Sequence, residues 1–308
     1  GLLMTLSYTS QRKELETRLR LAASIFEACS EGILVVDAQN RIISVNPAFT
    51  ALLGYEAEDV IGHDPSELGS ARNAPSLYRS LWQAVEEYGH WEGEIWNCCK
   101  DGQEIALWMT VNTLRNHKGE VQWRFALFSD ITERKRSDEL IWRQANYDML
   151  TGLPNRRLFR DRLQHEIKKA ARAGQNLALF FIDLDHFKEV NDAFGHDCGD
   201  QLLIEAGERI RSCLRETDTV ARLGGDEFTA ILADMRDRER AVSVAMAITR
   251  ILAMPFMIEG QDTFISASVG IAFYPQDAEN DLLLLKQADR AMYAAKAKGR
   301  NCYSMVAD

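Results

Sequence analysis

Residues 219–232 read TVARLGGDEFTAIL, and this stretch decides how the second half of the chain is organised. Its two β-rich runs, 219–223 and 227–232, flank the pair Gly224-Gly225, a pattern typical of a β-hairpin. A tip without side chains lets a ligand approach the backbone closely. Two acids follow this tip at once, so carboxylates lie where a phosphate could arrive. Taken alone, the same residues also describe a solvated hairpin turn.

A second informative stretch is the apolar run 177–184, which predicts a strand buried on both faces. Asp183 lies at its end, in FIDLDHFKEVND. A carboxylate there is costly unless it is paired or holds a cation. An ion pair with a lysine is one interpretation. In the other, Asp183 and Asp226 meet across neighbouring strands and form a Mg²⁺ site that substrate phosphates complete.

The rest of this half predicts helices packed around a central sheet. An apolar stripe at helical spacing runs through 159–170 and ends at Gly174. Further helices are expected at 199–214, 240–253 and 282–298, and further strands at 219–223, 227–232 and 264–273.

The first half predicts an α+β arrangement of helix, two strands, short helices and three strands. The expected elements are a helix at 11–28, two strands around a turn at 37–41, a helix at 46–55, helical segments within 59–88, and strands at 91–98, 104–114 and 121–129. In the first helix, Leu15, Leu19, Ala22 and Phe26 fall on one stripe.

A charged helix is expected from residue 130 to about residue 146, with Ile131, Leu140, Ile141 and Ala145 as candidate seam positions. A polar linker helix and a parallel coiled coil between two protomers both fit this short pattern, and both stay open.

Length and composition set the outer bounds. The 308 residues are enough for two domains, and 46% apolar with 27% charged residues is typical of a globular protein. A net charge of −10 argues against binding to nucleic acid. No apolar run is long enough to span a bilayer, and the six cysteines lack zinc-like spacing. We therefore expect a cytoplasmic protein with reduced thiols.

Residues 224–228 spell Gly-Gly-Asp-Glu-Phe, the signature of the GGDEF family, the diguanylate cyclases. Residues 147–157, YDMLTGLPNRR, resemble the opening motif of the same domain. The resemblance implies a nucleotide-cyclase-like, ferredoxin-like α/β domain at 148–308. It also implies an enzyme that condenses two GTP into cyclic di-GMP and two pyrophosphates, using Mg²⁺ or Mn²⁺, with each protomer of a homodimer holding one GTP.

The first half resembles the PAS family of sensor domains, an antiparallel sheet with short helices. The matching motifs are Glu31-Gly32-Ile33, Asn46-Pro47-Ala48-Phe49, Gly54-Tyr55, Ile61-Gly62, Trp91-x-Gly93-Glu94, Lys100-Asp101-Gly102 and Asp130-Ile131-Thr132-Glu133-Arg134. The expected organisation is a signalling helix at 1–24, a PAS domain at 25–133, a linker helix at 134–147 and the GGDEF domain.

The GGDEF resemblance assigns roles to the acids. Asp183 and Asp226 match the metal-binding carboxylates, helped by the backbone carbonyl of Leu184. Glu227 matches a residue linked to metal binding and to activation of the attacking hydroxyl.

Substrate and product contacts also follow from the resemblance. Asn191 and Asp200 match guanine-binding positions. Residues expected to face the phosphates are Lys188, Lys296, Arg300 and the hairpin glycines Gly224 and Gly225. Arg215 and Asp218 form an R-x-x-D pair that is separated from Gly224 by five residues. This motif at this position matches the family's product-inhibition site for cyclic di-GMP.

The PAS domain's ligand stays open. His63 and His90 are candidate haem ligands, and Trp91 and Asn97 are shared with some flavin-binding PAS domains. Cys98-Cys99 replaces a basic pair common at this point, and no cofactor is the default expectation. The alternative function is a non-catalytic signalling module that binds GTP or cyclic di-GMP and acts through partner contacts.

Overall fold

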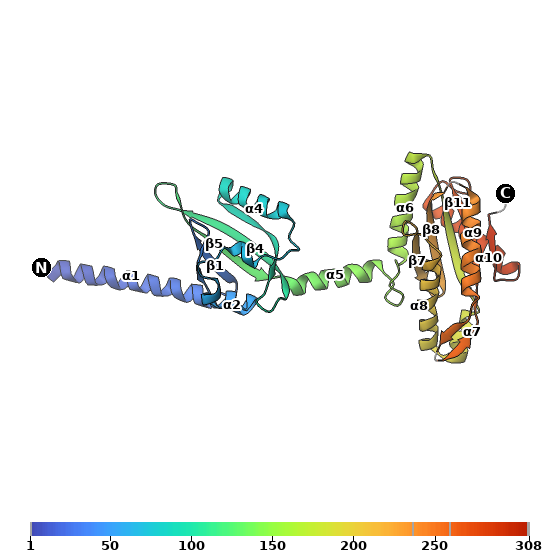
Figure 1. The fold of residues 1–308 in the computed structure, drawn as a ribbon, viewed down its shortest axis with the longest axis horizontal. Coiled ribbons are helices and arrows are strands. Elements are labelled where there is room, and N and C mark those ends of the chain that lie inside the picture. Colours follow the sequence, from blue (N-terminus) through green and yellow to red (C-terminus); the bar gives the residue numbers. More distant parts are fainter. Residues whose placement is uncertain (1, 236, 259, 307–308) are drawn as a thin grey trace. The chain divides into compact units, whose positions relative to one another are not determined.

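The computed structural model describes residues 2–235, 237–258 and 260–306. The expected ranges 1–24 and 148–308 also contain residues 1, 236, 259, 307 and 308, which lie outside the described residues. The chain divides into two compact units, Gly1–Glu139 and Leu140–Asp308 (Figure 1). Among the described residues, no helix has the length and apolar character needed to cross a membrane.

The first unit is a five-stranded antiparallel sheet in the order β2-β1-β5-β4-β3, with helices beside it. Its elements are α1 (Leu2–Ala28), β1 (Gly32–Asp37), β2 (Ile42–Val45), α2 (Pro47–Leu53), α3 (Ala57–Val60), η1 (Pro65–Leu68), α4 (Pro75–Tyr88), β3 (His90–Cys98), β4 (Glu104–Arg115) and β5 (Val121–Asp130), followed by α5 (Thr132–Asn146), which crosses the division between the units.

A buried asparagine joins three elements of this unit. The Oδ1 of Asn46 accepts hydrogen bonds from the N–H of Phe49 (3.0 Å) and of Ile33 (2.8 Å). The first bond caps α2 and the second ties that cap to β1. The side-chain amide of Asn46 also donates to the carbonyls of Phe26 and Glu31, which fixes the end of α1.

The second unit is a five-stranded sheet in the order β12-β11-β6-β8-β7, in which only β12 runs parallel to its neighbour. Its elements are α6 (Arg156–Ala173), β6 (Asn176–Asp185), α7 (Phe187–Phe194), α8 (His196–Ser212), β7 (Thr219–Gly224), β8 (Glu227–Met235), α9 (Arg238–Leu252), β9 (Phe256–Ile258), β10 (Gln261–Thr263), β11 (Ser266–Tyr274), α10 (Asp281–Ala297) and β12 (Tyr303–Met305).

The central strand β6 explains the two-layered core of this unit. Alternate side chains of a strand point to opposite faces of the sheet. Ala178, Phe180 and Ile182 therefore belong to one apolar cluster, whereas Leu179 and Phe181 belong to the other. Helices cover both faces, and the order β11-β6-β8-β7 is that of a ferredoxin-like domain.

The fold class expected from the sequence is confirmed, as are the predicted hairpin and the buried strand. The structure adds α7 and the short strands β9, β10 and β12, which the sequence analysis missed. The helix expected at 199–214 also begins earlier, at His196. Helix α7 and the three short strands span only three to eight residues each, which is too short for a periodic apolar pattern to be recognised.

Candidate active site

The hairpin between β7 and β8 meets the end of β6 at one edge of the sheet. Gly224 and Gly225 have φ angles of 143° and 53°, a backbone shape that glycine adopts readily. Asp183 is the direct cross-strand partner of Glu227. The N–H of Leu184 donates to the carbonyl of Asp226 (3.3 Å). The three acids expected to be functional are therefore brought to one place.

Asp183 is the most deeply buried of these acids, with 11% of its side chain exposed. Burial raises the pKa of Asp183 above its ordinary value, and the nearby carboxylates of Asp226 and Asp185 act in the same direction. The ammonium of Lys296 lies 2.7 Å from Asp183 Oδ1 and opposes this shift. A buried site that raises a carboxyl pKa in this way favours a bound cation.

The donor set suits a metal that the substrate helps to hold. Within the described part of the chain, no group of three or more His, Cys, Asp or Glu side chains is placed to hold a metal ion. Mg²⁺ typically takes one or two carboxylates together with substrate phosphates and water. Asp183 and Asp226, converging at the hairpin, fit that pattern.

A further acid, Asp185, organises the neighbouring loop. Its side chain is fully buried and accepts hydrogen bonds from Ser266 and Ser268 (both 2.7 Å) and from the N–H of Asn301 (3.1 Å). Arg300, which has a φ of 63°, places its Nε 4.0 Å from the same carboxylate. Asp185 therefore positions the loop that carries Arg300. Asp185 lies two positions after Asp183, so both side chains point to the same face of the strand. This spacing was the sequence signal from which Asp185 could have been identified.

A second missed residue, Arg222, fixes the hairpin tip. Its guanidinium donates twice to the carbonyl of Gly225 (2.9 and 2.8 Å) and once to Asp148 Oδ1 (2.8 Å). Burial alone would raise the pKa of Asp148, but hydrogen bonds from Thr151 and Arg222 outweigh it and hold the pKa below its ordinary value. The segment that opens the domain is thereby tied to the glycine tip.

Two family models divide the chain in the same way as its sheets. The model described as "Diguanylate cyclase, GGDEF domain" matches residues 145–302, and a PAS domain model matches residues 30–133. The chain belongs to the GGDEF diguanylate cyclase family. Its architecture is a PAS domain followed by a GGDEF domain.

Curated relatives of the chain also contain regions similar to its GGDEF domain. The chain is 46% identical over 172 residues to "Bifunctional diguanylate cyclase/cyclic di-GMP phosphodiesterase MucR" of Pseudomonas aeruginosa, covering 56% of this chain and 25% of MucR. It is 32% identical over 292 residues to "Cyclic di-GMP phosphodiesterase PdeR" of Escherichia coli, covering 94% of this chain and 43% of PdeR. The chain thus spans less than half the length of either relative.

Among solved structures, the crystallised GGDEF domain of TpbB from Pseudomonas aeruginosa superimposes with a TM-score of 0.50 at 41% identity. The match covers 51% of this chain and 99% of that domain. The shared region is therefore a complete GGDEF domain, in both sequence and backbone shape.

In the GGDEF domain, the expected guanine-binding residues lie near the start of α8. Asn191 is in α7, and its side-chain oxygen occupies the space that a Cβ at residue 199 would take. Gly199 thus lets Asn191 pack against the first turn of α8, one residue before the exposed Asp200. Lys188, also exposed, is in the first turn of α7.

Glu227 has a neighbour that the sequence did not reveal. Arg156 Nη2 lies 3.4 Å from Glu227 Oε2, with 64% and 37% of the two side chains exposed. An exposed ion pair of this kind is worth at most about 1 kcal/mol. Arg156 therefore partly offsets the charge of Glu227 but does not fix the position of its side chain.

Arg215 and Asp218, the R-x-x-D pair of the GGDEF domain, line a cavity of about 410 Å³. Arg162 and Arg211 line the same cavity. Arg215 is exposed, whereas only 1% of the Asp218 side chain is. Arg240 donates to both oxygens of Asp218 (3.0 and 2.7 Å). Asp218 also accepts from the N–H of Arg215 (3.1 Å). In this structure Asp218 holds the turn in shape, and Arg215 is the member of the pair that faces solvent.

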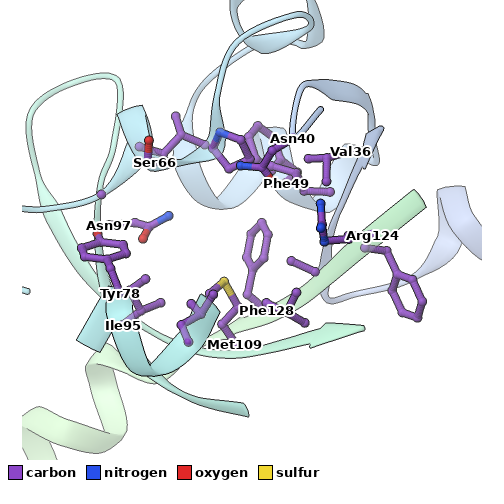
Figure 2. Close-up of a pocket in the computed structure, with 18 of the residues that line it drawn as sticks. Val36, Asn40, Phe49, Ser66, Tyr78, Ile95, Asn97, Met109, Arg124 and Phe128 are labelled. Carbon is purple, nitrogen blue, oxygen red and sulfur yellow. The ribbon is translucent and has the colours of Figure 1, made fainter. Parts of the chain in front are cut away.

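The PAS residues considered for cofactor binding are dispersed. His63 is exposed and contacts Glu67 (3.0 Å), and the ring of His90 contacts Asn112 (2.9 Å). Neither histidine lines the cavity of the PAS domain, which Figure 2 shows, whereas Asn97 does. The two candidate haem ligands are therefore not placed to bind a group inside this cavity.

Proposed function

We propose that this chain is a Mg²⁺-dependent diguanylate cyclase that makes cyclic di-GMP and two pyrophosphates from two GTP. The observation that carries the proposal is the meeting of Asp183, Asp226 and Glu227 at one sheet edge, beside Lys296. Asp183 and Asp226 would hold the metal, which makes the α-phosphorus more electrophilic and stabilises the leaving pyrophosphate.

The protein's own groups supply positioning and proton transfer. The 3′-hydroxyl oxygen of one GTP bonds to the α-phosphorus of the other, and the bond from that phosphorus to the β-phosphate oxygen breaks. Glu227 accepts the hydroxyl proton, and pyrophosphate leaves. Lys188, Lys296 and Arg300 hold the triphosphate, while Asn191 and Asp200 bind the guanine edge. The same exchange in the opposite direction closes the ring.

We propose that the working unit is a homodimer, because one GGDEF domain supplies only one GTP and one set of acids. Exposed apolar side chains on the two helices that flank the PAS domain, α1 and α5, support this proposal. On α1, Leu15 and Leu19 are 59% and 62% exposed, and on α5, Leu140 and Ile141 are 57% and 59% exposed. Rows of this kind suit a parallel coiled coil, which would bring two GGDEF domains together.

Product inhibition would act through Arg215, whose exposed guanidinium can bind a phosphate or the guanine of cyclic di-GMP. Arg215→Ala is expected to raise the concentration of cyclic di-GMP needed for half inhibition by at least tenfold, with initial turnover unchanged. Initial rates measured against added product test this. An unchanged inhibition curve would remove Arg215 from the account.

A non-catalytic module is the second candidate, and the similarity to PdeR, a protein named as a phosphodiesterase, favours it. In that case the GGDEF domain would bind GTP or cyclic di-GMP and pass the signal to partners. Intact acids at Asp183, Asp226 and Glu227 favour the cyclase.

The deciding experiment is to incubate the full chain with GTP and Mg²⁺ and separate the products by chromatography. Cyclic di-GMP with pyrophosphate in a 1:2 ratio is expected. Asp226→Asn should lower turnover by at least 1,000-fold with an unchanged circular dichroism spectrum, because it removes a metal-binding charge. Unchanged GTP from the dimeric wild-type chain would favour the binding module, and full activity in Asp226→Asn would refute the metal site.

A further inference from the structure

The PAS domain contains a partly open cavity of about 90 Å³ on the inner face of its sheet. Its walls are almost entirely apolar and come from the sheet and from α2, η1 and α4. Figure 2 shows Phe49, Met109 and Phe128 around the open space. Polar side chains interrupt these walls at Asn40, Ser66, Tyr78, Asn97 and Arg124. The amide of Asn97 and the guanidinium of Arg124 lie on opposite sides of the cavity.

Arg124 is not satisfied by the protein. Its Nε is buried and has no hydrogen-bond partner among the described residues. Thr113, directly opposite Arg124 on β4, has a buried Oγ1 that likewise lacks a partner. Paired residues on neighbouring antiparallel strands point to the same face. Two hydrogen-bonding groups are therefore left unused on the same face of the sheet, of which Arg124 lines the cavity and Thr113 does not.

The described residues that line the cavity also offer no acidic partner for the charge of Arg124. The guanidinium stays protonated in proteins, and no residue that lines this cavity is an aspartate or a glutamate. The ring of Trp82 lies 5.6 Å from the guanidinium carbon and gives a partial cation–π contact. That ring cannot accept the Nε–H in the way an anionic oxygen would. The cavity thus presents one fixed positive charge within apolar walls.

We propose that this cavity binds a small apolar carboxylate, with the carboxylate on Arg124 and the hydrocarbon part against the apolar walls. A carboxylate accepts the free Nε–H of Arg124 and neutralises the charge of the guanidinium. The volume limits the ligand, because a cavity of 150 Å³ is filled by benzene. A cavity of about 90 Å³ suits a straight-chain acid of roughly three to five carbons.

The same volume separates this ligand from larger PAS cofactors. Sites for ligands of drug size measure roughly 300–1,000 Å³, several times the space found here. Haem and flavin exceed the cavity in this conformation. Water alone is the competing occupant, because Asn97 and Arg124 could each bind one water molecule.

The test is isothermal titration calorimetry on the full chain with the straight-chain carboxylates from acetate to octanoate, and with the matching primary amides. Affinity is expected to peak between propionate and pentanoate, and the amides should bind at least tenfold more weakly. Absence of binding by every acid, or equal binding by acids and amides, would overturn the proposal and favour water.

Substitutions of Arg124 test whether this residue binds the carboxylate. Arg124→Gln is expected to weaken binding of the best acid at least tenfold, and Arg124→Lys should retain more affinity because it keeps the charge. Arg79→Gln, an exposed arginine on α4 outside the cavity, is the matched control and should bind as wild type does. Circular dichroism confirms that each variant is folded, and wild-type affinity in folded Arg124→Gln would refute the assignment.

Discussion

At the scale of single residues, Lys296 and Asp183 form the pair on which the active-site edge depends. The ammonium lies where a metal would also be attracted, 2.7 Å from a carboxylate whose pKa is raised by burial. Removing the lysine leaves a buried carboxylate with no cation. The proposed metal would therefore share the Asp183 carboxylate with Lys296 or displace it.

Lys296→Met is expected to lower the free energy of unfolding of the GGDEF domain by about 2 kcal/mol in the absence of metal. Mg²⁺ alone should restore more stability to this variant than to wild type, because the cation replaces the lost ammonium beside Asp183. Denaturant unfolding with and without Mg²⁺ measures both effects. Lys286→Met, an exposed lysine on the same helix, is the control and should stay within 0.5 kcal/mol of wild type.

Residue positions that follow from one local motif were predictable, whereas contacts that depend on a distant partner were not. Asp183 at a strand end and Asp226 after the glycine pair could be placed from the sequence. Arg222 and Asp148 lie 74 positions apart, so their hydrogen bond could not be anticipated from spacing. The same holds for Arg240, which meets Asp218 from the following helix.

At the scale of elements, α10 lies directly on β11 at Gly270. A Cβ at this residue would overlap the carbonyl oxygen of Ala288 and the backbone nitrogen of Met292. These are main-chain atoms, so they cannot turn aside as the end of a side chain can. The glycine therefore sets how closely α10, which carries Lys296, approaches the sheet.

Gly270→Ala is expected to lower the free energy of unfolding by about 3 kcal/mol and to reduce cyclase turnover, because α10 must move away from β11. Gly207→Ala is the control, since the nearest atom there is Leu153 Cδ1 at 3.1 Å, which can shift. That change should cost little, because alanine favours the helix over glycine. Equal losses in the two variants, measured by denaturant unfolding, would contradict this account.

Element prediction succeeded where a long periodic pattern or a long unbroken apolar run was present. Strand β6 was visible because both of its faces are buried, which gives an unbroken apolar run. Helix α7 was not, because its eight residues follow His186 at a φ of 63° and carry only one fully buried apolar side chain, Val190. Its position is set by packing against α8, which no local pattern records.

At the scale of the whole molecule, the two units have separate cores. We propose that the PAS domain controls the GGDEF domain through the helices α1 and α5. The apolar clusters of the PAS and GGDEF domains share no buried residue. A signal from the PAS cavity could then reach the GGDEF domain by changing how two copies of the chain associate. The exposed apolar row on α1, Leu15 and Leu19, allows a test of this association without a change in the core of either domain.

Leu19→Glu is expected to weaken self-association at least tenfold, because it places a charge on the exposed apolar row that also contains Leu15. Cyclase activity per molecule should then fall steeply on dilution and recover at high protein concentration, as two GGDEF domains meet again. Analytical ultracentrifugation and product assays over the same concentration range measure the two effects. Thr17→Glu adds the same charge to the opposite face of α1, which carries the exposed Leu21 and Ile25, and should change neither if the seam follows Leu15 and Leu19. If Leu19→Glu stays dimeric and fully active at every concentration, α1 does not hold the dimer together, and the seam must lie elsewhere in the chain.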